Sequence, residues 1–485
     1  MQKALFKNSF IYSVTTFVQK GLVFLLLPLY TRYLPPHEYG IVTVILAISF
    51  ISSAFFTFGL DSAIIRFYYD ARHDTDEFKK LFGTLLIALF CISLSAFILA
   101  VTAFTPVVQF FMGDIPFYPY AYIGFAIVVF QPLYNLCLAF LQAKHQAASY
   151  SILSFIYFIL NIGFIILLVV ILHKGAIGYL LSILVAQALS SVIGLMILRK
   201  EFLFTFRTKF LKKALNYSMP LIPHSVASQA AGYADRIILN KFLVTSMAGI
   251  YHLGYVLSMP IEVLTFSINR AYTPLFFKQV SEKKDELSEV VDVGLVISLI
   301  YLFFSTALAI FSFEIVSWFF DESFLSAYKV IPFISFSFAN TGFYYLFSTV
   351  LFYDKSLTKF VPASTIIAGI TIITLDLILI PQFGFLGAGI AIYSGQLALA
   401  ILAYYFSRNK IIHWPLSKIV RCYLIAVGIS VAGIFINSLL PDLFFAIGLK
   451  LISLMVLLLF CSWIYYRNML QVFYRLFNVL KSLKK

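Results

Sequence analysis

Long apolar segments, separated by short polar connections, follow one another along almost the whole chain. Each is about 20 residues long, which is the length that an α-helix needs to cross a lipid bilayer. The pattern predicts an all-α polytopic membrane protein with about fourteen transmembrane helices. We expect these spans near residues 9–31, 40–66, 81–105, 120–141, 149–172, 178–198, 217–240, 249–275, 291–315, 330–352, 360–380, 388–406, 419–439 and 445–466.

The composition agrees with this pattern, because 61% of the residues are hydrophobic and only 12% are charged. A soluble domain has roughly 25% charged residues. Fourteen spans leave no room for a large soluble domain, and no loop is long enough for a nucleotide-binding fold. The sequence also lacks a GxxxxGK[ST] motif for ATP phosphates. We therefore expect any transport to be driven by a gradient.

The 35 Lys and Arg residues are distributed unevenly between the predicted connections. With the N-terminus inside, the cytoplasmic segments hold 26 of them and the outer loops hold four, as the positive-inside rule requires. Arg421 and Lys450 lie near helix ends, where long side chains reach the headgroups. The first segment has no small-residue cleavage site, so we expect no signal peptide and two cytoplasmic termini. Topology thus explains the net charge of +14, and no nucleic-acid partner is expected.

The chain aligns with itself when it is shifted by 209 residues. Glycine and polar positions then coincide, most clearly in the Gly-x-x-Gly turns that begin at Gly175 and Gly384. The shift relates six spans to six spans, and an even number of spans makes the two repeats parallel. The sequence therefore predicts two six-helix lobes, related by a pseudo-twofold axis along the membrane normal, with a cleft between them.

The predicted domains follow from this repeat. We expect an N-lobe at 1–198, a basic cytoplasmic linker at 199–216, a C-lobe at 217–406, two additional helices at 407–466 and a basic tail at 467–485. The tail places apolar residues at helical spacing among its cations, which is typical of an amphipathic helix on an anionic leaflet. A disordered basic tail is the alternative.

Polar residues form stripes along one face of four predicted spans, the first, second, seventh and eighth. The stripes contain Ser9, Ser13, Thr16 and Lys20; Ser49, Ser53, Thr57 and Asp61; Ser225, Ser228, Gln229, Gly232, Asp235 and Arg236; and Tyr255, Ser258, Glu262, Thr265 and Asn269. Arg66 and Arg270 lie further along the second and eighth spans. These stripes are the candidate lining of a polar cavity.

Charged residues within these spans are unfavourable, because inserting a Lys, Arg or Asp at the centre of a membrane helix costs roughly 2.5 to 3.5 kcal/mol of free energy. Their presence therefore indicates a function or a pairing. We interpret them as a water-filled cavity that binds an anion. Its predicted members are the cations Lys20, Arg66, Arg236 and Arg270, the neutral groups Thr16, Gln229 and Asn269, and the acids Asp61, Asp235 and Glu262, which couple an ion or pair with the cations. The alternative is structural, with Asp235 or Glu262 pairing with Lys20 or Arg236 to hold the lobes together.

Prolines occur in three of the four striped spans. They are Pro28, Pro220, Pro223 and Pro260. Each removes a backbone donor and clashes with the preceding turn, so these helices should bend. The bends are predicted to be hinges for alternating access or, alternatively, static kinks.

No catalytic or metal-binding motif has a suitable setting. Asp74 and Asp76 form a DxD pair, but no nucleotide-binding domain surrounds them. The four cysteines have no CxxC spacing, and the seven histidines form no HExxH motif. The longest outer loop, 106–119, is too short for the active site of a polysaccharide polymerase. The sequence therefore predicts no enzyme activity, no cofactor and no metal site.

Three segments resemble the Wzx-type polysaccharide flippases of the multidrug/oligosaccharidyl-lipid/polysaccharide (MOP) flippase superfamily. They are GLVFLLLPLYTRYLPPHEYGIVTV, FGLDSAIIRFYYD and IPQFGFLGAGIA, which begin at residues 21, 58 and 380. The resemblance implies a MATE-like fold in the bacterial cytoplasmic membrane and carries over Arg66 and the turn at Gly40. It also implies a cationic central cavity lined by the first, second, seventh and eighth spans.

The function that the resemblance implies is the translocation of undecaprenyl-(pyro)phosphate-linked oligosaccharide units to the outer leaflet, for O-antigen, capsule or exopolysaccharide synthesis. The partners are then this substrate, the lipid bilayer and other membrane proteins of polysaccharide assembly. The head group is predicted to enter an inward-open cleft while the polyprenyl tail stays in lipid and the lobes rock. An inside-negative potential favours outward movement of an anion by about 2.3 kcal/mol per charge per 100 mV.

Four other functions stay open at this point. A cation-coupled multidrug exporter and a lipid II flippase belong to the same superfamily. A non-transporting scaffold for glycan assembly and a polysaccharide polymerase belong to other functional classes.

Overall fold

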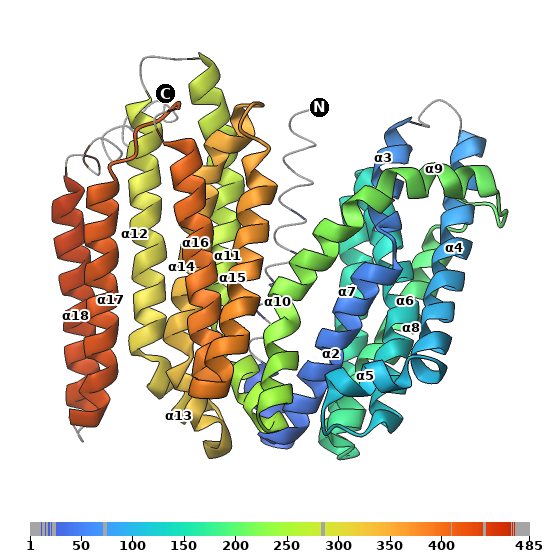
Figure 1. The fold of residues 1–485 in the computed structure, drawn as a ribbon, viewed down its shortest axis with the longest axis horizontal. Coiled ribbons are helices and arrows are strands. Elements are labelled where there is room, and N and C mark those ends of the chain that lie inside the picture. The colour runs from blue at the N-terminus through green and yellow to red at the C-terminus, as the bar shows by residue number, and fades with distance from the viewer. Residues whose placement is uncertain are drawn as a thin grey trace. The chain divides into compact units, whose positions relative to one another are not determined.

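The structure is a computed structural model that describes residues 11, 15, 18, 19, 21, 26–70, 75–282, 287–408, 410–439, 443–466, 468 and 470. All regular elements among these residues are helices (Figure 1), which confirms the predicted all-α fold. Eleven of the described helices are long and apolar enough to cross a membrane, or twelve if the bent pair at residues 322–353 forms one span.

These twelve elements correspond to twelve of the fourteen predicted spans. The predicted first span, 9–31, falls largely outside the described residues. The predicted seventh span is present as a helix at Ile222–Phe242, but its polar residues lower its hydropathy below that of the others. The predicted tail at 467–485 also lies outside the described residues, apart from positions 468 and 470.

Packing divides the chain into two compact units, Met1–His252 (unit 1) and Leu253–Lys485 (unit 2). The elements of unit 1 are α2 (Pro36–Phe56), α3 (Leu60–Asp70), α4 (Thr75–Thr102), α5 (Thr105–Met112), α6 (Phe117–Ala143), α7 (Ala147–Ile165), the π-helical segment η1 (Ile166–Ile171), α8 (Gly175–Ile197), α9 (Thr208–Ser218), the 3-10 turn η2 (Met219–Leu221) and α10 (Ile222–Phe242). Helix α11 (Thr245–Glu282) begins in unit 1 and continues into unit 2.

Helix α6 is central to unit 1, since α2, α3, α4 and α8 all pack against it. Helix α10 packs along α2, and α7 packs along α8. Aromatic side chains fill the core between α4 and α6, where the rings of Phe82 and Phe140 stack with their centroids 4.8 Å apart. Such rings contribute a large buried apolar area and prefer offset stacking.

Unit 2 contains α12 (Ser288–Ile310), α13 (Ser312–Phe319), the 3-10 helix η3 (Glu322–Lys329), α14 (Ile331–Tyr353), α15 (Phe360–Phe383), α16 (Phe385–Ser407), α17 (Leu416–Leu439) and α18 (Leu443–Ile464). Helix α16 packs against α14 and α15, and α14 packs against α12. The last two helices, α17 and α18, lie side by side and both contact α12 (Figure 1). Helix α12 therefore joins them to the rest of unit 2.

The predicted sequence repeat has a counterpart in the helix order. Helix α2 begins at Pro36 and α11 at Thr245, which is 209 residues later. The short helices α5 and α13 also follow equivalent long helices, α4 and α12. Gly175 and Gly384 both have left-handed backbones, with φ of 54° and 63°, and they begin or immediately precede α8 and α16. Both Gly-x-x-Gly turns thus begin with a glycine of positive φ, which suits the conformational freedom of glycine.

The glycines of the first equivalent helices make close contacts within unit 1. A Cβ atom on Gly40 would lie 2.1 Å from the carbonyl oxygen of Thr245, and one on Gly249 would lie 2.2 Å from that of Pro36. Only glycine allows two helix backbones to approach this closely. Gly40, which was predicted to form a turn, lies near the beginning of α2 and allows α2 and the beginning of α11 to pack closely.

Two sequence predictions differ in detail from the structure. The second span was predicted as one helix at 40–66, but it breaks after α2 because Phe58 and Gly59 have left-handed φ angles of 50° and 63°. The equivalent part of α11 is continuous. The basic linker predicted at 199–216 contains α9, which packs across α3 and α4. The predicted lobe boundaries stay predictions, whereas the compact unit that contains the N-terminal spans extends to His252.

Candidate functional site

A polar cavity lies in unit 1 between α2, α6 and α10, beside the break that follows α2. Its volume is about 160 Å³. The side chains around it are mainly amides and hydroxyls, with a few apolar groups. The lining residues are Phe50, Ser53, Ala54, Thr57, Gly59, Leu89, Gln131, Pro132, Asn135, Ser225 and Gln229.

The polar members of this lining form three pairs, each with the spacing of one helical turn. Helix α2 supplies Ser53 and Thr57, α6 supplies Gln131 and Asn135, and α10 supplies Ser225 and Gln229. Residues four apart lie on the same face of a helix. The three helices therefore present their polar faces to one shared space.

Further along α10, the adjacent residues Asp235 and Arg236 form a buried ion pair. The Arg236 Nη1 atom lies 2.6 Å from the Asp235 Oδ1 atom, and the two residues are 1% and 3% exposed. Arg236 also donates to the carbonyl oxygen of Gly232, while the Tyr251 hydroxyl donates to the Asp235 Oδ2 atom at 2.6 Å. The rings of Tyr233 and Tyr251 lie near the guanidinium group. The charge of Arg236 is thus balanced within unit 1 by its neighbour.

The end of α10 is held by neutral hydrogen bonds. The Asn240 side chain donates to the carbonyl oxygen of Met112 at 2.6 Å, and it accepts a hydrogen bond from the Thr245 hydroxyl at 2.8 Å. Asn240 is 5% exposed. It therefore links α10 to the end of α5 and to the beginning of α11.

The other predicted cations have different surroundings. Arg66 on α3 and Arg270 on α11 are both exposed, and Arg270 stacks over the ring of Phe266 at 4.5 Å. Lys20 and Thr16 lie outside the described residues, and so does the side chain of Asp61. The cavity roles predicted for all of these residues stay predictions.

The predicted neutral and acidic residues also have different positions. Gln229 lines the cavity in unit 1. Glu262 and Asn269 are half-buried on α11, where the Asn269 side chain accepts a hydrogen bond from Thr273. Ser49, from the predicted stripe on the second span, is buried and donates to the carbonyl oxygen of Gly124 on α6. Ser49 therefore serves helix packing, while Ser53 and Thr57 face the cavity.

The four predicted hinge prolines occupy two kinds of position. Pro220 lies in the 3-10 turn between α9 and α10, and Pro223 lies in the first turn of α10, where a missing backbone donor is tolerated. Pro260 is inside α11, and Pro28 is in the helical segment that precedes α2. Their proposed hinge role remains a prediction.

The sequence analysis missed two polar features, one at the cavity in unit 1 and one in unit 2. Gln131 and Asn135 lie on the fourth predicted span, which was not recognised as polar, although their spacing of four was a usable signal. Lys450 was expected to reach the headgroups, but it is fully buried and lies 2.5 Å from the Glu314 Oε1 atom. That ion pair joins α13 to α18, and the large separation of the two residues in sequence hid it.

A second polar link joins α17 to α12. Asn468 donates to the buried Asp292 carboxylate at 2.6 Å and accepts a hydrogen bond from Lys418 at 3.0 Å. In the described part of the chain, no group of three His, Cys, Asp or Glu residues is arranged to hold a metal ion. The polar contacts described above are therefore hydrogen-bonded amides and hydroxyls, together with paired charges.

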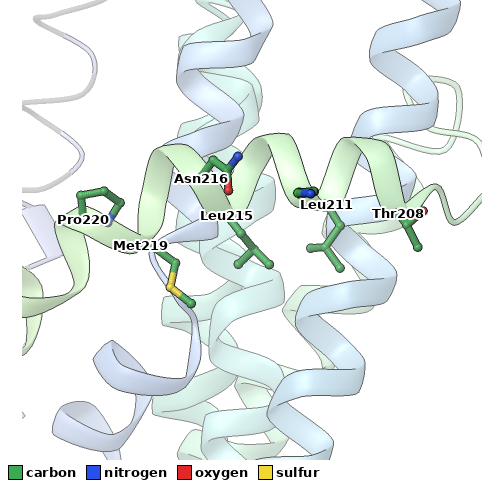
Figure 2. A pocket seen from close by; sticks show the side chains of 7 residues that line it. Thr208, Leu211, Leu215, Asn216, Met219 and Pro220 are labelled. Atoms are coloured by element: carbon green, nitrogen blue, oxygen red, sulfur yellow. The ribbon is translucent and has the colours of Figure 1, made fainter.

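Helix α9 carries a shallow, open hollow of about 490 Å³ on its surface. Leu211, Leu215 and Met219 point to the same side of this part of the chain (Figure 2), and Lys212 also lines the hollow. Lys209 and Lys213 are exposed on the same helix. The combination of an apolar side and lysines is typical of a helix at a membrane surface.

Comparison with known proteins identifies the family of this chain. The model of the family described as polysaccharide biosynthesis protein matches residues 5–280, more than half of the chain. The Lsg locus putative protein 1 of Haemophilus influenzae is 27% identical over 163 residues. That match covers 32% of this chain and 40% of the relative, so the aligned segment spans less than half of the relative's length.

Several solved structures have the same fold. The lipid II flippase MurJ in an inward closed conformation matches with a TM-score of 0.74 at 15% identity, over 95% of this chain and 100% of MurJ. An inward-facing MATE multidrug resistance transporter of the MOP superfamily matches with a TM-score of 0.63 at 16% identity, over 81% of this chain and 94% of the transporter. A MOP superfamily transporter from Pyrococcus furiosus matches with a TM-score of 0.57 at 16% identity, over 84% of this chain and 95% of the transporter. The chain therefore belongs to the polysaccharide biosynthesis protein family and has the fold of the MOP superfamily, in agreement with its resemblance to Wzx-type flippases.

Proposed function

We propose that this protein flips polyprenyl-(pyro)phosphate-linked oligosaccharide units from the cytoplasmic to the outer leaflet of the bacterial inner membrane. The observation that carries this proposal is the match to polysaccharide biosynthesis proteins over residues 5–280. It occurs in a chain with at least eleven helices that are long and apolar enough to cross a membrane. Glycans made on a membrane carrier need a protein of this kind because their polar head groups do not cross hydrocarbon unaided.

In this proposal the lipid phosphates are bound by arginine and lysine side chains. Arg66 and Arg270 support it, because both are exposed while the guanidinium group of Arg236 is buried beside Asp235. A planar guanidinium group binds phosphate oxygens in a bidentate manner. We assign phosphate binding to Arg66, Arg270 and Lys20, and the positioning of α10 to Arg236.

The remaining predicted residues have supporting roles in the proposed cycle. Asp61 and Glu262 would couple the movement to protons or sodium ions, while the membrane potential favours outward transfer of the anionic head group. Pro28, Pro220, Pro223 and Pro260 would allow their helices to bend as the carrier alternates its access. In this proposal both termini lie in the cytoplasm, and the partners include other membrane proteins of polysaccharide assembly.

The test is a flipping assay in proteoliposomes with undecaprenyl-pyrophosphate that carries a short fluorescent oligosaccharide. Arg66→Ala and Arg270→Ala should each lower the initial rate by about tenfold to a hundredfold, the loss expected for one hydrogen bond to a charged group. The rate is measured from the label that becomes accessible to an external quencher.

Arg408→Ala is a matched control, because Arg408 is also exposed and also stacks over an aromatic ring, that of Tyr405, at 4.3 Å. It should change the rate by less than twofold. Equal rates for all three variants would contradict the assigned phosphate ligands. Transport of an organic cation without any flipping of the lipid-linked glycan would favour the multidrug exporter instead.

A further inference from the structure

The cavity between α2, α6 and α10 has no role in the phosphate binding proposed above. Among the described residues that line it, none has a charged side chain. A buried charge is usually paired with a group of opposite charge, and an organic cation is commonly bound by an aromatic cage. The chemistry of this lining therefore fits a neutral, polar ligand.

The polar groups of the cavity match the hydrogen-bonding character of hydroxyls. Three amides and three hydroxyl side chains line it. Each can donate and accept hydrogen bonds, as a sugar hydroxyl can. The Gln131 Oε1 atom is buried and has no hydrogen-bond partner among the described residues. A buried acceptor of this kind costs free energy until a donor reaches it, so the cavity is incomplete without a donating ligand or water.

The size of the cavity limits the ligand to a single ring. A volume of about 160 Å³ is well below the lower limit of roughly 300 Å³ for pockets that hold drug-sized molecules. It equals the space of about five liquid water molecules. Phe50 forms one apolar side of the cavity, and its ring is supported by Tyr233 at a centroid distance of 5.2 Å. The lining thus combines an aromatic surface with hydroxyls and amides, which suits the apolar and polar faces of a pyranose.

We propose that this cavity is a subsite for one uncharged sugar ring of the lipid-linked glycan, bound by the amides of Gln131, Asn135 and Gln229. The subsite deepens the proposed function and rests on it. In this assignment the arginine and lysine side chains bind the phosphates of the substrate, while the neutral cavity in unit 1 distinguishes a carrier with a sugar from a bare lipid phosphate.

The experiment compares two probes on the full-length protein in nanodiscs. One is undecaprenyl pyrophosphate, and the other is the same lipid with a single hexose, tested as glucose, galactose and N-acetylglucosamine. At least one sugar should increase the affinity over the bare lipid. Gln131→Leu and Asn135→Leu should each weaken binding of that glycolipid by about threefold to tenfold, the loss expected for one neutral hydrogen bond, and leave binding of the bare lipid unchanged.

Asn161→Leu is the matched control. The Asn161 Oδ1 atom is also buried without a hydrogen-bond partner among the described residues, but Asn161 lies on α7 and does not line the cavity. This variant should bind both probes as the wild type does. It therefore corrects for any general effect of replacing a buried amide with leucine.

The possible outcomes separate the two proposals. If neither lipid binds, the proposed flippase function is wrong. The sugar subsite is wrong if each of the three glycolipids binds with the same affinity as the bare lipid. It is also wrong if the cavity variants bind the glycolipid as Asn161→Leu does. In both cases the cavity holds only water, and the flippase function stands.

Discussion

Two regions of this protein handle polar groups inside apolar helices in opposite ways. In unit 1, Gln131 and its neighbours face a cavity as neutral groups, and one amide oxygen lacks a partner among the described residues. In unit 2, Glu314 and Lys450 are charged groups that bind each other directly, with exposed fractions of 2% and 0%. One region leaves hydrogen-bonding capacity unused, and the other matches its charge with a partner.

The difference separates sites that bind ligands from sites that hold helices. A buried charge is tolerated only when a partner stays beside it, so an ion pair such as Glu314–Lys450 suits a permanent contact. A neutral polar group costs less when it is temporarily without a partner, so it suits a surface that a ligand enters and leaves. Helix α18 is held by the Glu314–Lys450 ion pair, and α17 is linked to Asp292 through Lys418 and Asn468; both are permanent contacts. The cavity beside α10 is instead a neutral polar surface that a ligand can enter and leave.

The largest effect is expected when the buried ion pair in unit 2 loses one partner. Lys450→Met leaves the Glu314 carboxylate buried and unpaired, which should destabilise the protein by about 3 to 5 kcal/mol. The measurement is the unfolding midpoint of the purified protein in detergent. The double variant Glu314→Gln with Lys450→Met should recover most of the loss, because no uncompensated charge remains. A single variant as stable as the wild type would contradict the structural role of the pair.

An intermediate effect is expected at the charged cluster of unit 1. Tyr251→Phe removes the hydroxyl that donates to the Asp235 carboxylate, and a hydrogen bond to a charged group contributes about 1.5 to 3 kcal/mol. The unfolding midpoint should fall accordingly. Tyr466→Phe is the control, because Tyr466 is 60% exposed and its change should be negligible. Equal unfolding midpoints for the two variants would mean that the hydrogen bond from Tyr251 to Asp235 does not stabilise the protein.

The smallest effect on stability is expected at the cavity. Gln131→Leu should change the free energy of unfolding by no more than about 1 kcal/mol and should favour the folded state, because it removes a buried acceptor without a partner. The same variant is expected to weaken glycolipid binding, so binding and stability should change in opposite directions. A loss of more than about 2 kcal/mol would place Gln131 among the structural contacts and remove the contrast between the two regions.

The helices were predictable from the sequence because their signals are local. Apolar length gave twelve of the spans, and the repeated glycines predicted the turns that open α8 and α16. The break after α2 was not predictable, because Phe58 adopts a left-handed φ that a phenylalanine rarely has. Only the single glycine at position 59 hinted at it.

The polar contacts were harder to predict than the helices. The seventh span was correctly recognised as polar, and a pairing of Asp235 with Arg236 was one form of the structural alternative, as a contact between lobes. The two residues instead pair within α10. Glu314 and Lys450 are separated by 136 residues, and only the tertiary fold brings them together. The pairing of Glu314 with Lys450 depends on tertiary structure, which the spacing of residues in one sequence does not contain.

The packing of α10 against α2 has a consequence for the order of synthesis. Unit 1 extends to His252, so α10 and Gly249, which contacts Pro36, are made well after α8. A chain is translated from its N-terminus, and a compact unit folds when its last element is present. Until α10 leaves the ribosome, the Ser53 and Thr57 face of α2 has no partner from α10. Folding of unit 1 therefore requires translation of α10 and of the first residues of α11.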